Sequence, residues 1–184
     1  MTPTIAEQKA TARKAAFGRR KTAHRPGDHG QKLLAEIGAV RGRVIAGYMP
    51  IRTEIDPLPT MAVLAQESTL CVPIVRGAGQ ALEFRTWSPG CALEKGAFGA
   101  LIPTDGSLVQ PDTLIVPLVA FTDGCFRLGY GGGFYDRTLH GLRQRGPIRA
   151  LGFAYEAQFA PSLPLEDTDQ PLDVIVTEDA IHRP

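Results

Sequence analysis

The stretch Arg127-Leu128-Gly129-Tyr130-Gly131-Gly132-Gly133-Phe134-Tyr135-Asp136-Arg137 decides how this chain is interpreted, because it joins an apolar run to a helix-forming segment. The apolar run, residues 114–121, predicts a buried strand, and residues 138–143 read as the first turns of a helix. A glycine turn in this position is either a flexible connection or an anion site, where backbone N–H groups converge beside a helix start. The two arginines and the aspartate within it favour a phosphate site.

Outward from this stretch, helix-forming and strand-forming segments alternate. Helical patterns cover residues 4–23, 31–37 and 59–67. Strand patterns cover residues 43–49, 69–75, 81–87, 149–155 and 173–178. Residues 88–108 are rich in Gly and Pro and read as irregular, with a helical turn at 93–98. The alternation predicts a single α/β domain over residues 1–184, with a mainly parallel sheet between helical layers and the basic helix 4–23 packed on it.

The composition is that of an ordinary globular chain. A net charge of +1 does not favour nucleic acid or a membrane as a partner, although the first forty-odd residues are basic. The three cysteines lie far apart, without the spacing of a zinc site or a disulfide framework. No apolar run approaches the roughly 20 residues of a membrane span, and no hydrophobic signal core begins the sequence. We therefore expect a cytoplasmic protein, monomeric or weakly dimeric, that binds small molecules.

Ligands of parallel sheets gather at the carboxyl ends of the strands, where residues 49–54, the glycine stretch and residues 156–170 are all expected. The glycine stretch is not a P-loop, because no Lys-Ser or Lys-Thr follows it. It is not the dinucleotide fingerprint either, since it lies late in the chain and is more compact. None of the four histidines is near a Ser or Cys motif, so a His-based triad is not indicated.

Several charged residues have two possible roles. Lys9 and Arg13 share one helix face, which is either a solvated basic face or a source of charge for phosphates. Asp136 either caps a helix or binds Mg²⁺, with Asp167 or Asp169 as the second acid. Glu54 is either a surface carboxylate or an acceptor for the amino groups of a heterocycle.

Aromatic residues have a comparable ambiguity. They stack on a flat ligand or fill the core. The aromatic candidates are Tyr130, Phe134, Tyr135 and Trp87.

Six elements, in the same order, resemble the 5-formyltetrahydrofolate cyclo-ligase family. The glycine stretch looks like the family's RLGYGGGYYDR signature, with Phe134 for the first paired tyrosine, and residues 114–121 are similar to its (L/I)VPGVAF strand. Residues 9–13 look like KxxLR, and residues 173–178 like the closing DxxxTE. The remaining two matches are Tyr48-Met49-Pro50 followed by Glu54, and the loop with Gln158, Pro164, Glu166 and Asp169. This chain departs from the pattern at Ala12, Leu118 and Thr168, which replace Leu, Gly and His.

The resemblance implies a three-layer α/β/α sandwich. It also implies an enzyme that uses ATP and Mg²⁺ to convert 5-formyltetrahydrofolate into 5,10-methenyltetrahydrofolate, ADP and phosphate, through a phosphorylated formyl oxygen. Positioning and charge neutralisation would carry such chemistry, so no nucleophile is assigned, and Arg127, Tyr135 and Arg137 are the expected positioning residues.

By the same resemblance, each site residue has a role. The ATP ligands would be Lys9, Arg13, Arg127, Leu128, Gly129, Tyr130, Gly131, Gly132, Gly133, Phe134 and Tyr135. The folate ligands would be Met49, Glu54, Trp87, Tyr130, Gly131, Gly132, Gly133 and Phe134. The Mg²⁺ ligands would be Asp136 and Asp169, the latter beside the unusual Thr168.

Two other functions compete with this one. A paralogue of the same fold would keep ATP and Mg²⁺ but act on another substrate, against which the intact Glu54 argues. A non-catalytic RNA-binding module would use the basic N-terminus and the Gly/aromatic run to bind single strands. The near-zero net charge and Asp136 within the run argue against RNA binding.

Overall fold

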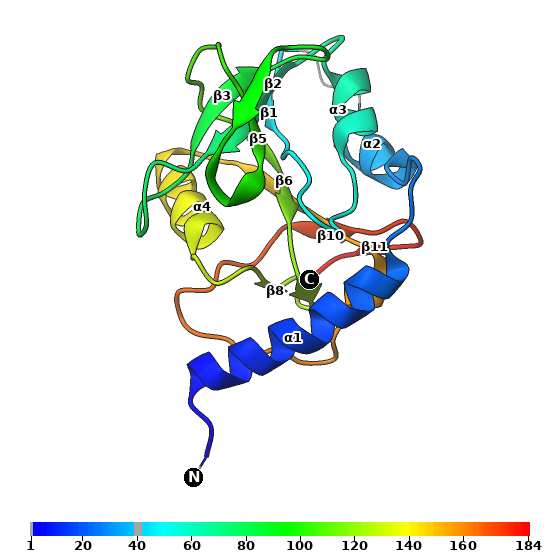
Figure 1. Ribbon diagram of the computed structural model, residues 1–184, viewed down its shortest axis with the longest axis vertical. Helices are drawn as coiled ribbons and strands as arrows, with labels where there is room; N and C mark the ends of the chain where they lie inside the picture. The colour runs from blue at the N-terminus through cyan, green and yellow to red at the C-terminus, as the bar shows by residue number, and fades with distance from the viewer. Residues whose placement is uncertain (1, 39–41) are drawn as a thin grey trace.

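The protein, described here from a computed structural model over residues 2–38 and 42–184, is built on a seven-stranded sheet (Figure 1). Its strands are β1 Val44–Ala46, β2 Thr69–Ile74, β3 Glu83–Trp87, β6 Thr113–Pro117, β9 Arg149–Phe153, β10 Val174–Val176 and β11 Ile181–His182. They are ordered β11-β10-β9-β6-β1-β2-β3. The five inner strands run parallel and the two edge strands antiparallel, which confirms the mainly parallel sheet.

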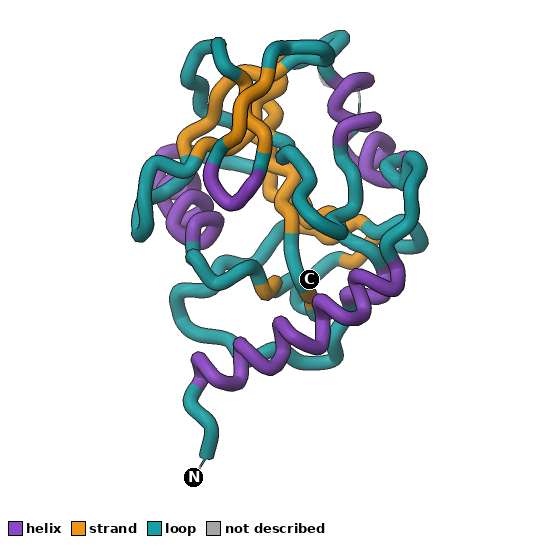
Figure 2. The backbone as a smooth tube through the Cα atoms, in the orientation of Figure 1, coloured by secondary structure: helices purple, strands orange, loops and turns teal. Residues whose placement is uncertain are grey.

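Helices cover both faces of the sheet, so the three-layer sandwich is confirmed (Figure 2). Helices α2, Gln31–Ile37, and α3, Leu58–Leu64, pack on one face, and α4, Phe134–Arg145, packs on the other. The sequence of β6 explains this arrangement, because its successive side chains alternate between the faces. Ile115 packs with α2 and α3, while Leu114 and Val116 pack with α4.

The basic helix α1, Ile5–Ala23, lies beyond the carboxyl end of the central strands (Figure 1). Thr4 and Glu7 form a capping box that fixes its start. Its buried Ala16 packs against Val119 and Ala120, which follow β6. This contact places the polar face of α1 next to the loops that leave the sheet. None of the described helices has the length and apolar character that crossing a membrane requires.

Three local predictions were wrong. The strand expected at 114–121 ends at Pro117, and the chain then forms a ribbon of β7, Ala120–Phe121, and β8, Arg127–Leu128. The helical turn expected at 93–98 is instead a hairpin of β4, Leu93–Lys95, and β5, Leu101–Pro103, around the 3₁₀ turn η1, Ala97–Gly99.

Helix α4 begins at Phe134 rather than near Thr138. Gly133, with a φ of 64°, supplies the left-handed turn from which the helix can start earlier. Cys71, Cys91 and Cys125 are free thiols, and Cys71 and Cys125 are buried.

Candidate active site

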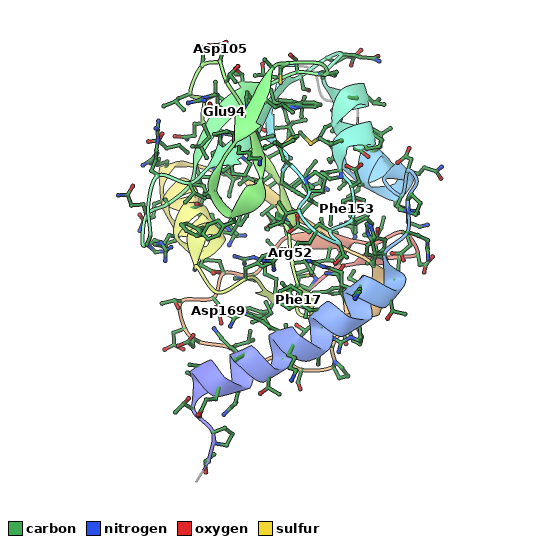
Figure 3. All side chains as sticks on the ribbon, viewed as in Figure 1. Phe17, Arg52, Glu94, Asp105, Phe153 and Asp169 are labelled. Carbon is green, nitrogen blue, oxygen red and sulfur yellow. The ribbon has the colours of Figure 1, made fainter. Side chains whose placement is uncertain are left out.

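A cavity of about 1150 Å³ lies between α1 and the carboxyl ends of β1, β2 and β6. The three loops expected there all contribute to its wall: the loop after β1, the glycine stretch and the loop that ends at Gln170. The hairpin of β4 and β5 forms a further wall that the sequence did not indicate. Phe17 of α1, Arg52 and Asp169 show how segments distant in sequence meet around the cavity (Figure 3).

The glycine stretch forms one wall because α1 holds its backbone from outside. Arg13 Nε donates a hydrogen bond of 2.8 Å to the carbonyl oxygen of Gly129. The Arg13 guanidinium carbon also lies 3.2 Å from the place where a Cβ on Gly131 would stand, and Gly131 has a φ of 103°. A side chain at position 131 would therefore be strained and would displace Arg13. The close approach of Arg13 requires glycine here.

Helix α4 starts at the end of this wall and no side chain caps it. Its first backbone N–H groups therefore remain available to an anion in the cavity. Asp136 is not the helix cap, because Gly133 occupies that position and Asp136 lies in the first turn. Its Oδ1 accepts hydrogen bonds from Arg127 Nη2, at 2.9 Å, and from the backbone N–H of Gln170, at 3.0 Å.

A second set of charges joins α1 to the loop before Gln170. Lys9 Nζ lies 2.7 Å from both Glu166 Oε2 and Asp169 Oδ2. Burial by itself would lower the pKa of Lys9, but the hydrogen bonds that Lys9 donates to Asp169 and Glu166 outweigh it and raise that pKa. Lys9 is therefore a fully charged cation at the edge of the cavity.

The carboxylates of Asp136 and Asp169 fit a Mg²⁺ ion bound together with a nucleotide. The backbone N–H of Gln170 donates to Asp136, and the preceding residue, Asp169, also lines the cavity. Over residues 2–38 and 42–184, no cluster of three or more His, Cys, Asp or Glu side chains forms a complete metal cage. Mg²⁺ commonly takes one or two carboxylates plus phosphate oxygens and waters, so two acids are a suitable donor set.

The loop after β1 contributes a buried carboxylate to the cavity wall, next to Tyr130 of the glycine stretch. Glu54, 6% exposed, accepts hydrogen bonds from the backbone N–H of Ile51, at 2.8 Å, and from the Tyr130 hydroxyl, at 3.0 Å. Burial raises the pKa of Glu54, which these bonds and the nearby Arg20 and Arg52 oppose. Glu54 thus lines the cavity as an acceptor, and the surface-carboxylate interpretation is wrong.

The hydroxyl of Tyr135 is buried, but no partner for it is found within the described residues. Because burial raises the pKa of Tyr135, this hydroxyl remains protonated. The Tyr135 side chain lines the cavity beside Asp136, while its hydroxyl itself is buried.

With one exception, the residues predicted for the site line this cavity. The exception is Trp87, which pairs with Leu70 at the amino end of β2, whereas the cavity lies at the carboxyl end near Ile74. Because β3 runs antiparallel to β2, its last residue points away from the site. Trp87 packs instead against the core between the sheet and α2 and α3, so its assignment as a ligand residue was wrong.

Sequence reasoning missed Phe17, Arg20 and Arg52 of the site, and also Phe98. Helical spacing places Phe17 and Arg20 on the same face of α1 as Lys9 and Arg13. Periodicity therefore offered a signal for Phe17 and Arg20. Arg52 has a φ of 55° and its guanidinium lies 5.9 Å from the centre of the Tyr130 ring. Phe98 lies at the tip of the missed hairpin, and its ring centre is 5.9 Å from that of Phe134.

The fold and the cavity define an α/β domain with a ligand site at the carboxyl edge of its sheet, lined by glycines, cations and a buried carboxylate. The sequence profile of the 5-formyltetrahydrofolate cyclo-ligase family matches residues 7–178. The chain belongs to this family.

Individual relatives agree with the family assignment. The 5-formyltetrahydrofolate cyclo-ligase of Haemophilus influenzae is 39% identical over 154 residues, which cover 79% of this chain and 82% of the relative. The Escherichia coli K12 protein of the same name is 47% identical over 70 residues, a match that spans 38% of either chain.

Solved structures are similar as well. The 5,10-methenyltetrahydrofolate synthetase of Aquifex aeolicus superposes with a TM-score of 0.74 at 31% identity, over 95% of this chain and 92% of that one. The Mycoplasma pneumoniae synthetase has a TM-score of 0.70 at 22% identity, over 92% and 98% of the two chains, and bears on the fold alone.

Proposed function

We propose that this protein catalyses the ATP-dependent closure of 5-formyltetrahydrofolate to 5,10-methenyltetrahydrofolate, with release of ADP and phosphate. The family assignment supports this activity. The observation that carries the proposal is that a single cavity brings a cationic glycine-rich wall and a buried carboxylate together. Its volume of about 1150 Å³ exceeds the roughly 300–1,000 Å³ typical of a single-ligand pocket, so it suits a nucleotide and a folate held side by side.

The nucleotide would occupy the wall next to α1 and the start of α4. Lys9 and Arg13 supply positive charge from α1, and residues 127–135 supply backbone N–H groups and Arg127. The Arg127 side chain is 4% exposed and is held by Asp136 and by the carbonyl oxygen of Gln170, at 2.6 Å. A cation fixed in this way loses little freedom when phosphate binds, which favours binding and positioning.

The pterin would occupy the part of the cavity formed by the loop after β1, with Glu54 accepting hydrogen bonds from its amino groups. Both carboxylate oxygens of Glu54 already accept one bond from the protein, and each keeps further acceptor capacity for a ligand. Met49, Tyr130, Phe134 and Gly131–Gly133 would contact the rest of the folate. This placement directs the formyl group toward the nucleotide wall.

The reaction we propose needs no protein nucleophile. The formyl oxygen attacks the γ-phosphorus of ATP, and the bond between that phosphorus and the bridging oxygen breaks to release ADP. N10 then attacks the formyl carbon, the C–O bond breaks, phosphate leaves and N10 loses its proton. Arg127 and Arg137 would neutralise the transferring phosphoryl group, and Tyr135 would help to position the wall that holds it. Asp136 and Asp169 would hold Mg²⁺, which supplies charge neutralisation on the phosphates when bound.

Absorbance of the methenyl product tests the proposal directly. We expect the signal to rise when the purified protein receives 5-formyltetrahydrofolate, ATP and Mg²⁺, and to stay flat without ATP or with excess EDTA. ATP hydrolysis without the chromophore would instead indicate a paralogue with another substrate. A folded protein that shows neither signal would refute the assignment.

A further inference from the structure

We infer that Arg20 is a positioning residue that fixes Glu54 in the loop after β1 and Tyr130 in the glycine stretch, from behind the cavity. The inference rests on the function proposed above and deepens it. Arg20 does not line the cavity, whereas Glu54 and Tyr130 do. It therefore acts through these two residues and not by touching a ligand.

The contacts of Arg20 reach two loops of the site at once. Its side chain is 1% exposed, an unusual position for an arginine in α1. Nη2 donates to the Tyr130 hydroxyl at 2.8 Å and Nε donates to Thr53 Oγ1 at 3.1 Å. Nη1 lies 4.0 Å from Glu54 Oε1 and is buried without a hydrogen-bond partner in the described structure.

These contacts set the direction of each hydrogen bond. A guanidinium can only donate, so the Tyr130 oxygen accepts from Arg20. The Tyr130 proton is then directed to Glu54 Oε1, 3.0 Å away, and Glu54 must accept it. The Ile51 N–H donates to the other carboxylate oxygen, so all protein contacts of Glu54 favour the ionised acceptor form.

Packing fixes the position of Tyr130 as well. The Arg20 guanidinium carbon lies 5.2 Å from the centre of the Phe17 ring and 5.4 Å from that of Tyr130. The two rings are themselves 5.5 Å apart. Since Tyr130 belongs to the glycine stretch, Arg20 couples α1, the loop after β1 and the nucleotide wall. A lysine would keep the charge but could not span Thr53 and Tyr130 with a planar fork.

The consequence for Glu54 depends on every charged or titratable group that faces it. These groups are Arg20 from α1, Arg52 from its own loop, Tyr130 from the glycine stretch, Tyr48 at the end of β1 and Tyr135 from α4. Arg20 and Arg52 are the two cations among them. Loss of Arg20 removes one of the two cations that lower the pKa of Glu54. Burial then raises that pKa further, so the carboxylate takes up its proton at higher pH.

The test compares Arg20→Met with Lys21→Met, its exposed neighbour in the last turn of α1. For Arg20→Met we expect the KM for 5-formyltetrahydrofolate to rise about 10- to 100-fold, equivalent to roughly 1.4–2.8 kcal/mol. Because Tyr130 belongs to the nucleotide wall, the KM for ATP should also rise, but by less than the KM for the folate. The acidic limb of kcat/KM for the folate should move to higher pH. Arg20→Lys should restore the acidic limb and only part of the KM, while Lys21→Met should match the wild type.

Other results would overturn the inference. A purely structural Arg20 would lower the melting temperature of Arg20→Met and leave both KM values and the pH profile of the folded fraction unchanged. If Arg20→Met does not fold, Tyr130→Phe breaks the same link, and an unchanged folate KM there would equally refute it. If the wild type turns over and the variants behave like it, only the inference about Arg20 is contradicted. If the wild type does not turn over, both the proposed function and the inference about Arg20 fail.

Discussion

Lys9 Nζ, from the second turn of α1, lies 2.7 Å from Asp169 Oδ2, near the other end of the chain. The two side chains are 10% and 15% exposed, so water screens their attraction only partly. One is proposed to hold phosphate and the other Mg²⁺. In the absence of ligands, each therefore neutralises the other and keeps α1 against the loop that carries the acids.

The variant Lys9→Met should lose both stability and ATP affinity. It leaves Asp169 and Glu166 close together without their cation, so we expect about 1–2 kcal/mol less stability in urea unfolding, between the values for surface and buried pairs. The KM for ATP should rise about tenfold, since one phosphate contact is lost. Lys14→Met, on an exposed position of α1, is the control. Equal behaviour of the two variants would contradict the role of Lys9.

Part of the stability that the protein loses below pH 5 should come from Glu156. Burial by itself would raise the pKa of Glu156, but the bonds from His182, at 2.9 Å, and Thr177, at 2.7 Å, lower it overall. A lowered pKa means that the contribution is complete above the ordinary value of 4.5 and is lost as the pH falls through the lower folded value. The difference in unfolding free energy between wild type and Glu156→Gln should therefore shrink below pH 4.5. A difference that is independent of pH from 3 to 7 would refute this.

Asp136 has two roles that two substitutions can separate. It accepts from Arg127, whose side chain is 4% exposed, and it is the proposed metal ligand. Asp136→Ala should abolish turnover and also cost roughly 1–3 kcal/mol, because a buried cation loses its partner. Asp136→Asn keeps an acceptor for Arg127, so it should recover part of the stability but not the turnover or the stabilisation by Mg-ATP. Thermal melts with and without Mg-ATP measure the difference, and turnover in either variant would remove the metal assignment.

The sequence predicted segments whose pattern is long and regular. Helix α1 and strand β2 lie where their periodicity placed them, and the loops around the cavity follow from the parallel strands. The β4–β5 hairpin could not be predicted, because each strand is only three residues long and all side chains of β4 are exposed. Trp87 was misplaced because the alternating pattern of residues 81–87 predicts a strand but not the direction in which it runs. The strand β3 is antiparallel to β2. Arg20 was missed since a charged residue on a basic helix is normally solvated.

Gly131 provides the sharpest test of the glycine wall. Its φ of 103° costs any residue with a Cβ about 1–2 kcal/mol, and that Cβ would meet the Arg13 guanidinium at 3.2 Å. Arg13 would have to move, and its 2.8 Å bond to Gly129 would weaken. We therefore expect Gly131→Ala to fold with reduced stability and to lose at least about tenfold in kcat/KM for ATP.

Gly141 in α4 is the matched control, because an added Cβ there meets no atom within 4 Å and its backbone is helical. Gly141→Ala should stabilise the protein by roughly 0.5–1 kcal/mol through helix propensity, with turnover unchanged. Both variants are assayed at the same temperature. Full activity of Gly131→Ala would then show that the glycine wall tolerates displacement of Arg13. The nucleotide contacts would then have to come from α4 and Arg127 alone.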